Sequence, residues 1–445
     1  MKTQRTGMAN LQSTAGVAYG NIGQRVSDPW PEGNAATELE TGQEQVTIAG
    51  GRSPGRGSRL RRTTLMGIAL AGCLLESVAR AQTPIPATYV MPLGAADTSR
   101  PGFVWRIHQV TTPQPNSNVR TEQQLAGLLG DNIADPNALG AALAAASPAG
   151  FSTAPIAFNI GTVINLSRDG AENAGNFAPD NPFPGLPGLT GSSENVAAEI
   201  LTWLDLPAGE ITLGVNSDDG FEMTLGGVSP FDRISGTKVG AFDGGRGAAD
   251  TIFSITVAQA GLYAARCTWE QGIGGANIEI FSVNPDGTRV LVNDTANGGI
   301  PAYSGVTAPR AYVRSIAPLP GTLRAPASGP VVVELAEGAS AINSSGITLS
   351  INGANVVPTT TKSGSVWTIS YTPTPPFASG SQQNVVLSYM DGSLPVSDAW
   401  SFHVAWVTSG GQFAADFDSG QPPGTMLFGS AHVDASGGVG NWVCK

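Results

Sequence analysis

Short runs of alternating apolar and polar residues, each ended by turn residues, recur along most of the chain after residue 82. Between residues 197 and 293 these runs predict strands, because alternation places one set of side chains on a buried face. The predicted strands cover residues 197–205, 211–215, 221–225, 251–257, 262–269, 276–281 and 289–293. The 58 glycines and 32 prolines are numerous enough to form turns between so many short strands. The pattern therefore predicts an all-β chain.

A change in composition divides this β-rich part in two. Residues 318–321 and 325–330 are rich in proline and glycine, which is typical of a boundary between modules. Five further strands are predicted at residues 331–335, 347–351, 366–371, 384–389 and 400–406. On this pattern, residues 309–408 resemble the Ig-like modules of bacterial surface proteins, although they lack paired cysteines. We expect this module to act as a spacer or stalk.

One part of the chain has helical periodicity instead. Thr121 and Gln124 form a capping box, and apolar residues at helical spacing follow it at Leu125, Leu128 and Leu129. Asp135-Pro136 predicts the start of a second helix. Its apolar positions are Leu139 and Leu143. We expect both helices to pack over a sheet or cover its edge, without a chemical role.

The amino end has the pattern of an exported protein. Residues 1–62 are rich in Gly, Ser, Thr and Gln without apolar periodicity, and we interpret them as a disordered leader or an over-extended start. A basic cluster then precedes the uncharged run 65–75, and small residues stand at Ala79 and Ala81. This order predicts a signal peptide over residues 63–81, cut after Ala81. The apolar run is too short for a membrane anchor, which needs about 20 residues.

A second interpretation of the same region is a lipoprotein signal. Leu70-Ala-Gly-Cys73 resembles a lipoprotein box, with Cys73 as the residue that carries the lipid. A leucine pair and Glu76 follow Cys73, where a polar tether is typical. Both interpretations predict a secreted or cell-surface protein.

The charge of the exported part limits the kinds of partner. From residue 82 onward, 14 Lys and Arg stand against 28 Asp and Glu, a formal charge of −14. Nucleic acids and anionic membrane surfaces are therefore unfavourable partners. The acidity serves solubility or cation binding, and composition does not separate the two.

Motifs of metal and catalytic chemistry are absent from the sequence. After residue 82 only Cys267 and Cys444 remain, too far apart for a disulfide framework or a zinc site, and Cys267 fits a strand core. The three histidines lie in different segments, and no Gly-x-Ser-x-Gly elbow, His-Glu-x-x-His or P-loop occurs. We expect a protein that is not an enzyme. A glycosidase with two carboxylates stays open, because its acids need no common motif.

Three segments carry a resemblance to a known family. They are LPAGEITLGVNSDDGFEMTLGG at 206–227, VAQAGLYAARCTWEQGIGGANIEIFSV at 257–283 and PDGTRVLVND at 285–294. Their order is similar to that in the PA14 family, in which a hairpin ending in Ser-Asp-Asp-Gly precedes a second, glycine-rich hairpin. The resemblance implies that residues 82–308 form a PA14-like β-sandwich with a helical insertion. It is specific for the fold and only weakly specific for function.

Asp218 and Asp219 are candidate metal ligands. On a regular strand adjacent side chains point to opposite faces, but in a loop, or across a cis peptide bond, both carboxylates can converge. In fungal adhesins of the PA14 family a matching pair binds Ca²⁺, which in turn coordinates sugar hydroxyls. The resemblance therefore implies Ca²⁺ at Asp218 and Asp219, with further oxygens from the segment Glu270–Ala276. The alternative is that residues 217–220 are only a tight turn whose Asp side chains bond local N–H groups.

Residues 242–250 are expected beside this site. Arg246 is the candidate to bridge to a carboxylate, and Asp243 and Asp250 are candidates to add oxygens, unless the segment is an ordinary exposed loop. The single aromatics Trp203 and Trp269 follow strand alternation, so we expect them in the core.

Residues 409–445 are glycine-rich and look like the truncated start of a concanavalin-like jelly-roll of the laminin-G type. The whole pattern predicts a bacterial secreted or cell-surface protein that binds carbohydrate or glycoconjugate, with calcium dependence as a further hypothesis. Two alternatives stay open: a structural surface or stalk protein without ligand, and a non-catalytic accessory fragment of a secreted glycoside hydrolase. The ligand and the oligomeric state do not follow from the sequence.

The predicted cleavage gives the first testable outcome. We expect exported material to begin at Gln82, because Ala79 and Ala81 supply the small residues that signal peptidase requires. Amino-terminal sequencing of the secreted protein checks this. A lipid on Cys73, or retention of residues 1–62, would contradict it.

Overall fold

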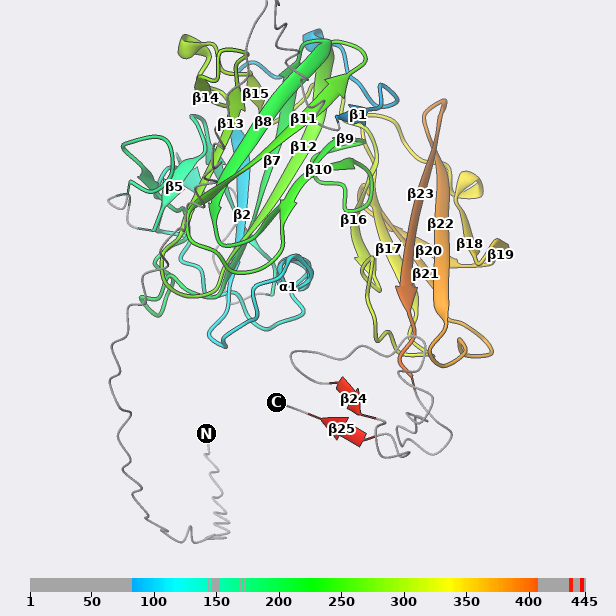
Figure 1. Cartoon of the computed structure of the whole chain (residues 1–445). Coiled ribbons are helices and arrows are strands. Elements are labelled where there is room, and N and C mark those ends of the chain that lie inside the picture. The colour runs from blue at the N-terminus through cyan, green and yellow to red at the C-terminus, as the bar shows by residue number, and fades with distance from the viewer. Residues whose placement is uncertain are drawn as a thin grey trace, which may run out of the picture. The chain divides into compact units, whose positions relative to one another are not determined.

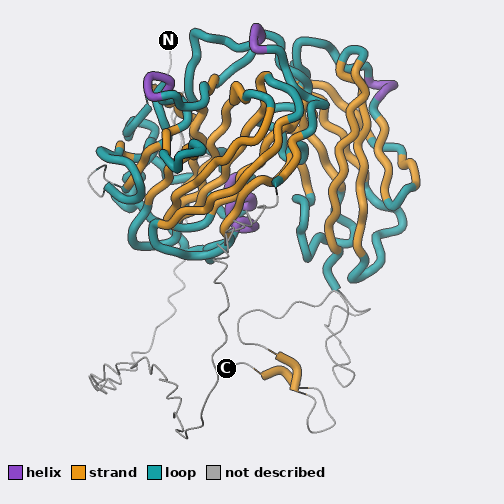
Figure 2. The backbone as a smooth tube through the Cα atoms, turned by 45° about the horizontal axis from the view of Figure 1, so that its top comes forward, coloured by secondary structure: helices purple, strands orange, loops and turns teal. Residues whose placement is uncertain are grey.

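The computed structural model describes residues 82–142, 144–145, 153–168, 170 and 173–406, and two short strands at 432–434 and 441–443. This part of the chain is almost entirely β-structure, as the alternation predicted (Figure 1). Figure 2 shows that strands make up most of the described chain and that helical turns are few and short. None of the helices described there is long and apolar enough to cross a bilayer.

Two sheets form the first sandwich. One has the order β1-β11-β8-β13-β5-β6, with β14 on β13, and the other has the order β10-β9-β12-β7-β2-β4-β3, with β15 on β7. The strands of the first sheet are β1 Thr83–Ile85, β5 Asn165–Ser167, β6 Asn181–Pro182, β8 Gly209–Asp218, β11 Ala249–Val257, β13 Asn277–Val283 and β14 Arg289–Leu291. Those of the second are β2 Phe103–Gln109, β3 Ala144–Ala145, β4 Ile156–Ile160, β7 Val196–Leu206, β9 Phe221–Gly227, β10 Thr237–Phe242, β12 Gly261–Gln271 and β15 Ala302–Tyr303.

The core of this sandwich follows from strand alternation. On β12, Cys267 and Trp269 face the core, and Thr268 between them faces away from it. Trp269 stacks on Phe183 with ring centroids 4.7 Å apart, and Trp105 lies 6.0 Å from Trp269. Trp203 and Trp269 are both buried, as expected, and burial also raises the pKa of the Cys267 thiol. Each strand predicted between residues 197 and 293 is present, and most extend one or two residues further.

The helical predictions were partly wrong. The helix α1 spans Asn118–Leu125, and its cap is Ser117, whose hydroxyl accepts a hydrogen bond from the Arg120 N–H. The predicted capping box at Thr121 lies inside this helix, because Ser117 offers an earlier cap. After Asp135-Pro136 the chain forms turns rather than a helix, and Leu143 lies outside the described residues. Short 3-10 turns occur at Leu93–Ala95, Thr295–Asn297 and Ser344–Gly346.

A second pair of sheets follows in the sequence. Their orders are β16-β17-β21-β20 and β19-β18-β22-β23, all antiparallel. The strands are β16 Tyr312–Ala317, β17 Val331–Ala336, β18 Thr348–Ile351, β19 Ala354–Val356, β20 Thr359–Ser363, β21 Val366–Tyr371, β22 Gln382–Asp391 and β23 Leu394–His403. They share one hydrophobic core, so this segment is also a sandwich. The assignment of residues 309–408 as an Ig-like module stays a prediction.

Other predictions fall largely outside the described residues. The leader at 1–62 and the signal peptide at 63–81 are among them. In the segment 409–445, β24 His432–Asp434 pairs antiparallel with β25 Asn441–Val443, and the jelly-roll assignment is otherwise untested.

The second sandwich should fold alone. All buried residues of its core except Val228 lie between residues 311 and 404. A fragment of residues 310–408 is therefore expected to unfold in a single cooperative transition with a β-type circular dichroism spectrum. Because Val228 is lost, we expect the fragment to be less stable than the same segment in the full chain. Gradual, non-cooperative melting would show that the predicted boundary is misplaced.

Candidate functional site

The outer face of β12 presents a charged row toward α1. Alternation places Arg266, Thr268 and Glu270 on this face, opposite the core. The carboxylate of Glu270 pairs with the Arg120 guanidinium of α1 at 2.8 Å. The Arg266 guanidinium donates to both carboxylate oxygens of Glu122, at 2.5 and 3.0 Å. Two ion pairs of opposite polarity therefore bind the helix to the strand.

A further buried carboxylate, Glu199 on β7, joins this network. It pairs with Arg233 at 2.9 Å and Arg266 at 2.8 Å, and also with Arg106. Burial alone would raise the pKa of Glu199, but the guanidinium groups of Arg233, Arg106 and Arg266 outweigh it and hold the pKa below its usual range. The three cations therefore favour the charged form of this carboxylate.

Asp218 and Asp219 lie at the corner between β8 and β9, joined by a cis peptide bond. The carboxylate of Asp219 accepts hydrogen bonds from the backbone N–H groups of Arg246 at 2.9 Å and Gly272 at 3.0 Å. The Asp218 carbonyl accepts a hydrogen bond from the Trp269 indole N–H at 3.1 Å. The corner is therefore fixed both to the segment after β12 and to the segment after β10.

Arg246 is part of this corner, but in a different way from the predicted bridge. Its guanidinium donates to the Ser217 carbonyl at 3.1 Å and to the Ser217 hydroxyl at 2.8 Å. It also lies over the Phe242 ring, 4.3 Å from the centroid. The hydrogen bond from Arg246 to the Asp219 carboxylate comes from its backbone N–H. Arg246 therefore orders the corner rather than presenting its charge to solvent.

Glu270 is a strand residue and is fully buried. Its Oε2 accepts a hydrogen bond from the Ser117 N–H at 2.8 Å, in addition to the Arg120 ion pair. Burial raises the pKa of Glu270 to about 7; Arg120 and the Ser117 N–H oppose the rise, and nearby Asp219 adds to it. The neighbouring Asn118 N–H donates to Asp243 at 2.7 Å. The residues just before and within the first turn of α1 thus reach the Asp218–Asp219 corner.

Three oxygens near this corner are closed to solvent and accept no hydrogen bond: Asn116 Oδ1, Asn118 Oδ1 and Glu270 Oε1. The backbone of three nearby glycines approaches the side chains of this corner closely. A Cβ on Gly275 would lie 2.9 Å from Asp218 Oδ2, and one on Gly220 would lie 2.6 Å from Glu270 Oε1. A Cβ on Gly245 would lie 2.8 Å from the Asn116 amide nitrogen and 3.5 Å from Asp219 Oδ1.

These donors fit a hard cation, because all are oxygens. Within the described residues no group of three or more His, Cys, Asp or Glu side chains is placed to hold a metal. Such an ion would therefore need amide and carbonyl oxygens besides the two aspartates. Carbonyls stand close by, since the Gly220 Cβ position lies 3.0 Å from the Phe242 oxygen and 3.2 Å from the Gly244 oxygen.

The structure brings together Asp218, Asp219, Glu270 and Arg246, with Asp243 at the edge. Asp250 belongs to a different cluster, in which Asn176 and Asn216 donate to it at 2.8 and 2.7 Å and Arg289 pairs with it at 2.8 Å. Sequence reasoning missed Asn116, Asn118 and Arg120. The polar run Asn116-Ser-Asn118, which directly precedes a helix, is the sequence feature that could have indicated them.

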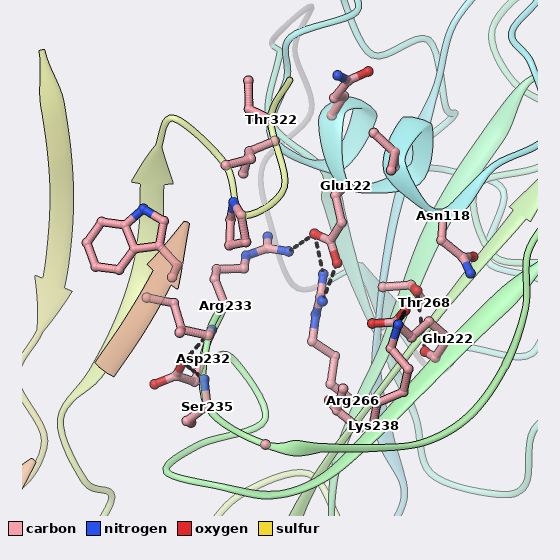
Figure 3. Close-up of a pocket in the computed structure, with 18 of the residues that line it drawn as sticks. Asn118, Glu122, Glu222, Asp232, Arg233, Ser235, Lys238, Arg266, Thr268 and Thr322 are labelled. Carbon is pink, nitrogen blue, oxygen red and sulfur yellow. Dashed lines mark hydrogen bonds and ion pairs between the residues drawn. The ribbon is translucent and has the colours of Figure 1, made fainter. Parts of the chain in front are cut away.

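A pocket of about 420 Å³ lies along α1 and β12 (Figure 3). Its walls come from α1, from β9, β10 and β12, from residues 232–236, from residues 319–322 and from Ala399-Trp400. Figure 3 shows Glu122 between Arg233 and Arg266, with Lys238 and Glu222 beside Thr268. Lys238 and Glu222 pair at 2.5 Å. Asn118 lines this pocket and also contacts the Asp218–Asp219 side through Asp243.

Comparison with known proteins finds similarity among solved structures only. No family model matches the chain, and no curated protein matches it. The PA14 domain of the MpAFP antifreeze protein is 16% identical, with a TM-score of 0.29 over 46% of this chain and 91% of that one. The PA14 sugar-binding domain from an RTX adhesin is 13% identical, with a TM-score of 0.29 over 46% and 99%.

A third similar structure is the epithelial adhesin 9 A domain from Candida glabrata in complex with Galb1-3GlcNAc. It is 11% identical, with a TM-score of 0.28 over 50% of this chain and 97% of that one. All three similarities cover about half of the chain at low TM-score. The all-β fold therefore rests on the strands described above.

The buried network around Glu199 gives a testable outcome. Replacing Glu199→Gln leaves three guanidinium groups without their shared anion, so we expect a loss of about 3–5 kcal/mol in the free energy of unfolding. Urea denaturation of the full chain measures it. The control is Glu210→Gln, an exposed change on β8 that is expected to stay within about 0.5 kcal/mol of the parent. Equal midpoints for the two variants would contradict a structural role for the network.

Proposed function

We propose that this protein binds carbohydrate or glycoconjugate through Ca²⁺ held at the Asp218–Asp219 corner. The observation that carries the proposal is the set of oxygens around the corner: two aspartates, with Asn116 Oδ1 and Glu270 Oε1 closed to solvent and accepting no hydrogen bond. Buried acceptors are normally satisfied, so such a group requires an explanation. A bound cation would explain these oxygens, because it would take the place of the missing hydrogen-bond donors.

Calcium suits these donors better than other common ions. It takes roughly six to eight oxygen ligands at about 2.3–2.6 Å and accepts carboxylate, amide and carbonyl oxygens together. These distances are shorter than a water contact, so a cation can occupy space that excludes water. Zinc and copper favour nitrogen and sulfur donors, whereas the candidate donors at this corner are all oxygens.

The carbohydrate part of the proposal depends on the ligands that the protein does not supply. With two carboxylates and a few amide or carbonyl oxygens, a Ca²⁺ ion at the corner keeps positions for outside oxygens. Vicinal hydroxyls of a sugar are neutral oxygen donors and fill such positions. The resemblance of the residues 206–294 to the PA14 family implies the same role. We propose a binding role without catalysis, at an extracellular location.

Calorimetry in millimolar Ca²⁺ and in chelator tests the cation. Binding to the native state should raise the free energy of unfolding by about 2.7 kcal/mol at a hundredfold excess over Kd. The double variant Asp218→Asn, Asp219→Asn should lose this increment, because the amides carry no charge. The matched control is Asp131→Asn, Asp286→Asn, two exposed positions outside the strands, which should keep the increment.

A glycan array probed with the full chain, in calcium and in chelator, tests the ligand. Carbohydrate signals that require both calcium and the two aspartates would support the proposal. If wild-type protein melts at the same temperature in both buffers, residues 217–220 are only a turn, and the calcium part of the proposal is wrong.

A further inference from the structure

We propose that the pocket along α1 and β12 is a second binding site, which takes a neutral polyhydroxylated ligand of one or two sugar rings without any cation. The site is distinct from the Asp218–Asp219 corner. This second proposal therefore does not depend on calcium binding at that corner. Its volume, about 420 Å³, is in the ordinary range for small-molecule sites, about 300–1,000 Å³.

The charges of the pocket are already compensated within the protein. Arg266 is held by Glu122 and Glu199, Arg233 pairs with Glu199 at 2.9 Å, and Lys238 pairs with Glu222 at 2.5 Å. Asp232 accepts hydrogen bonds from the Ile234 and Ser235 N–H groups, both at 2.8 Å. An anion would have to displace Glu122 or Glu199 from its arginines, and a cation would meet guanidinium groups. The pocket therefore favours a neutral ligand.

The pocket lining combines polar and apolar side chains. Hydroxyl groups come from Thr224, Ser235, Thr268 and Thr322. Apolar surface comes from Val119, Ile234, Leu319, Pro320 and Trp400. A sugar ring also presents both kinds of surface, because its hydroxyls lie at the edge and its C–H groups form an apolar face. Sugar hydroxyls both donate and accept hydrogen bonds, which suits a wall that carries threonine and serine hydroxyls.

The ion pairs also fix the shape of the pocket. Arg266, Arg233 and Glu122 are long side chains that would lose rotamer freedom if a ligand had to order them. Here Glu199 holds Arg233 and Arg266 in place, and Arg266 holds Glu122 through two hydrogen bonds. A site ordered before binding loses less affinity to side-chain ordering.

A bulky side chain placed at the rim of the pocket should block ligand binding and so tests the proposal. Val119 lines the pocket on α1 and is 60% exposed, so Val119→Trp adds an indole there without entering a core. The matched control is Val357→Trp, at a residue that is 92% exposed and does not line the pocket. Equal melting temperatures show that both variants fold like the parent.

Saturation-transfer NMR on the full chain, in chelator, uses lactose, maltose and cellobiose as probes. At least one of these sugars should bind to wild type, to Val357→Trp and to the Asp218→Asn, Asp219→Asn variant. Affinity for that sugar should fall at least tenfold in Val119→Trp.

Three outcomes would overturn the proposal: no sugar binds in chelator, binding is lost in the aspartate variant, or Val119→Trp binds like wild type. Tighter binding of inorganic sulfate than of any sugar, lost in Val119→Trp, would also overturn it in favour of an anion site. Failure of the calcium proposal has a separate signature, the absence of any calcium effect on melting.

Discussion

Two ion pairs of opposite polarity hold α1 on β12, and the arrangement of both candidate sites depends on them. Arg120 of the helix pairs with Glu270 of the strand, and Glu122 pairs with Arg266. The first pair brings Asn116 and Asn118 to the Asp218–Asp219 corner. The second pair forms a wall of the pocket. The opposite polarity also fixes direction, because a helix reversed end for end would oppose like charges.

Such pairs are costly to bury, and their presence calls for a physical reason. Replacement of buried ion pairs by apolar residues is often neutral or stabilising, so stability alone does not explain them. An eight-residue helix has little stability of its own and needs tertiary contacts. Apolar contacts would allow α1 to slide or rotate, whereas ion pairs with hydrogen bonds define one position. We therefore interpret the role of the ion-pair network as fixing the position and orientation of α1 on the sheet.

The sequence predicted the strands and the Asp218–Asp219 corner well, because both depend on local patterns. Alternation places Trp269 in the core and Glu270 outside it, and Ser217-Asp-Asp-Gly220 marks the turn. The contribution of Asn116 and Arg120 was not predictable in this way. Ser117 contacts Glu270 across 153 positions, and no periodicity encodes a contact of that range. The helix start was misplaced for a related reason: two cap signals compete, and tertiary contacts favour Ser117 over Thr121.

The regular rise of β12 sets a fixed distance between the two candidate sites. Glu270 stands at one of them and Arg266 at the other, four residues apart on the same face, which corresponds to about 13 Å at about 3.3 Å per residue. Because a hydrogen-bonded strand in the middle of a sheet does not stretch, this distance acts as a molecular ruler. A branched or linear oligosaccharide long enough to reach both sites would bind the second from a high local concentration once held at the first. Two such sites on one strand would then bind an oligosaccharide that reaches both of them more tightly than a single sugar.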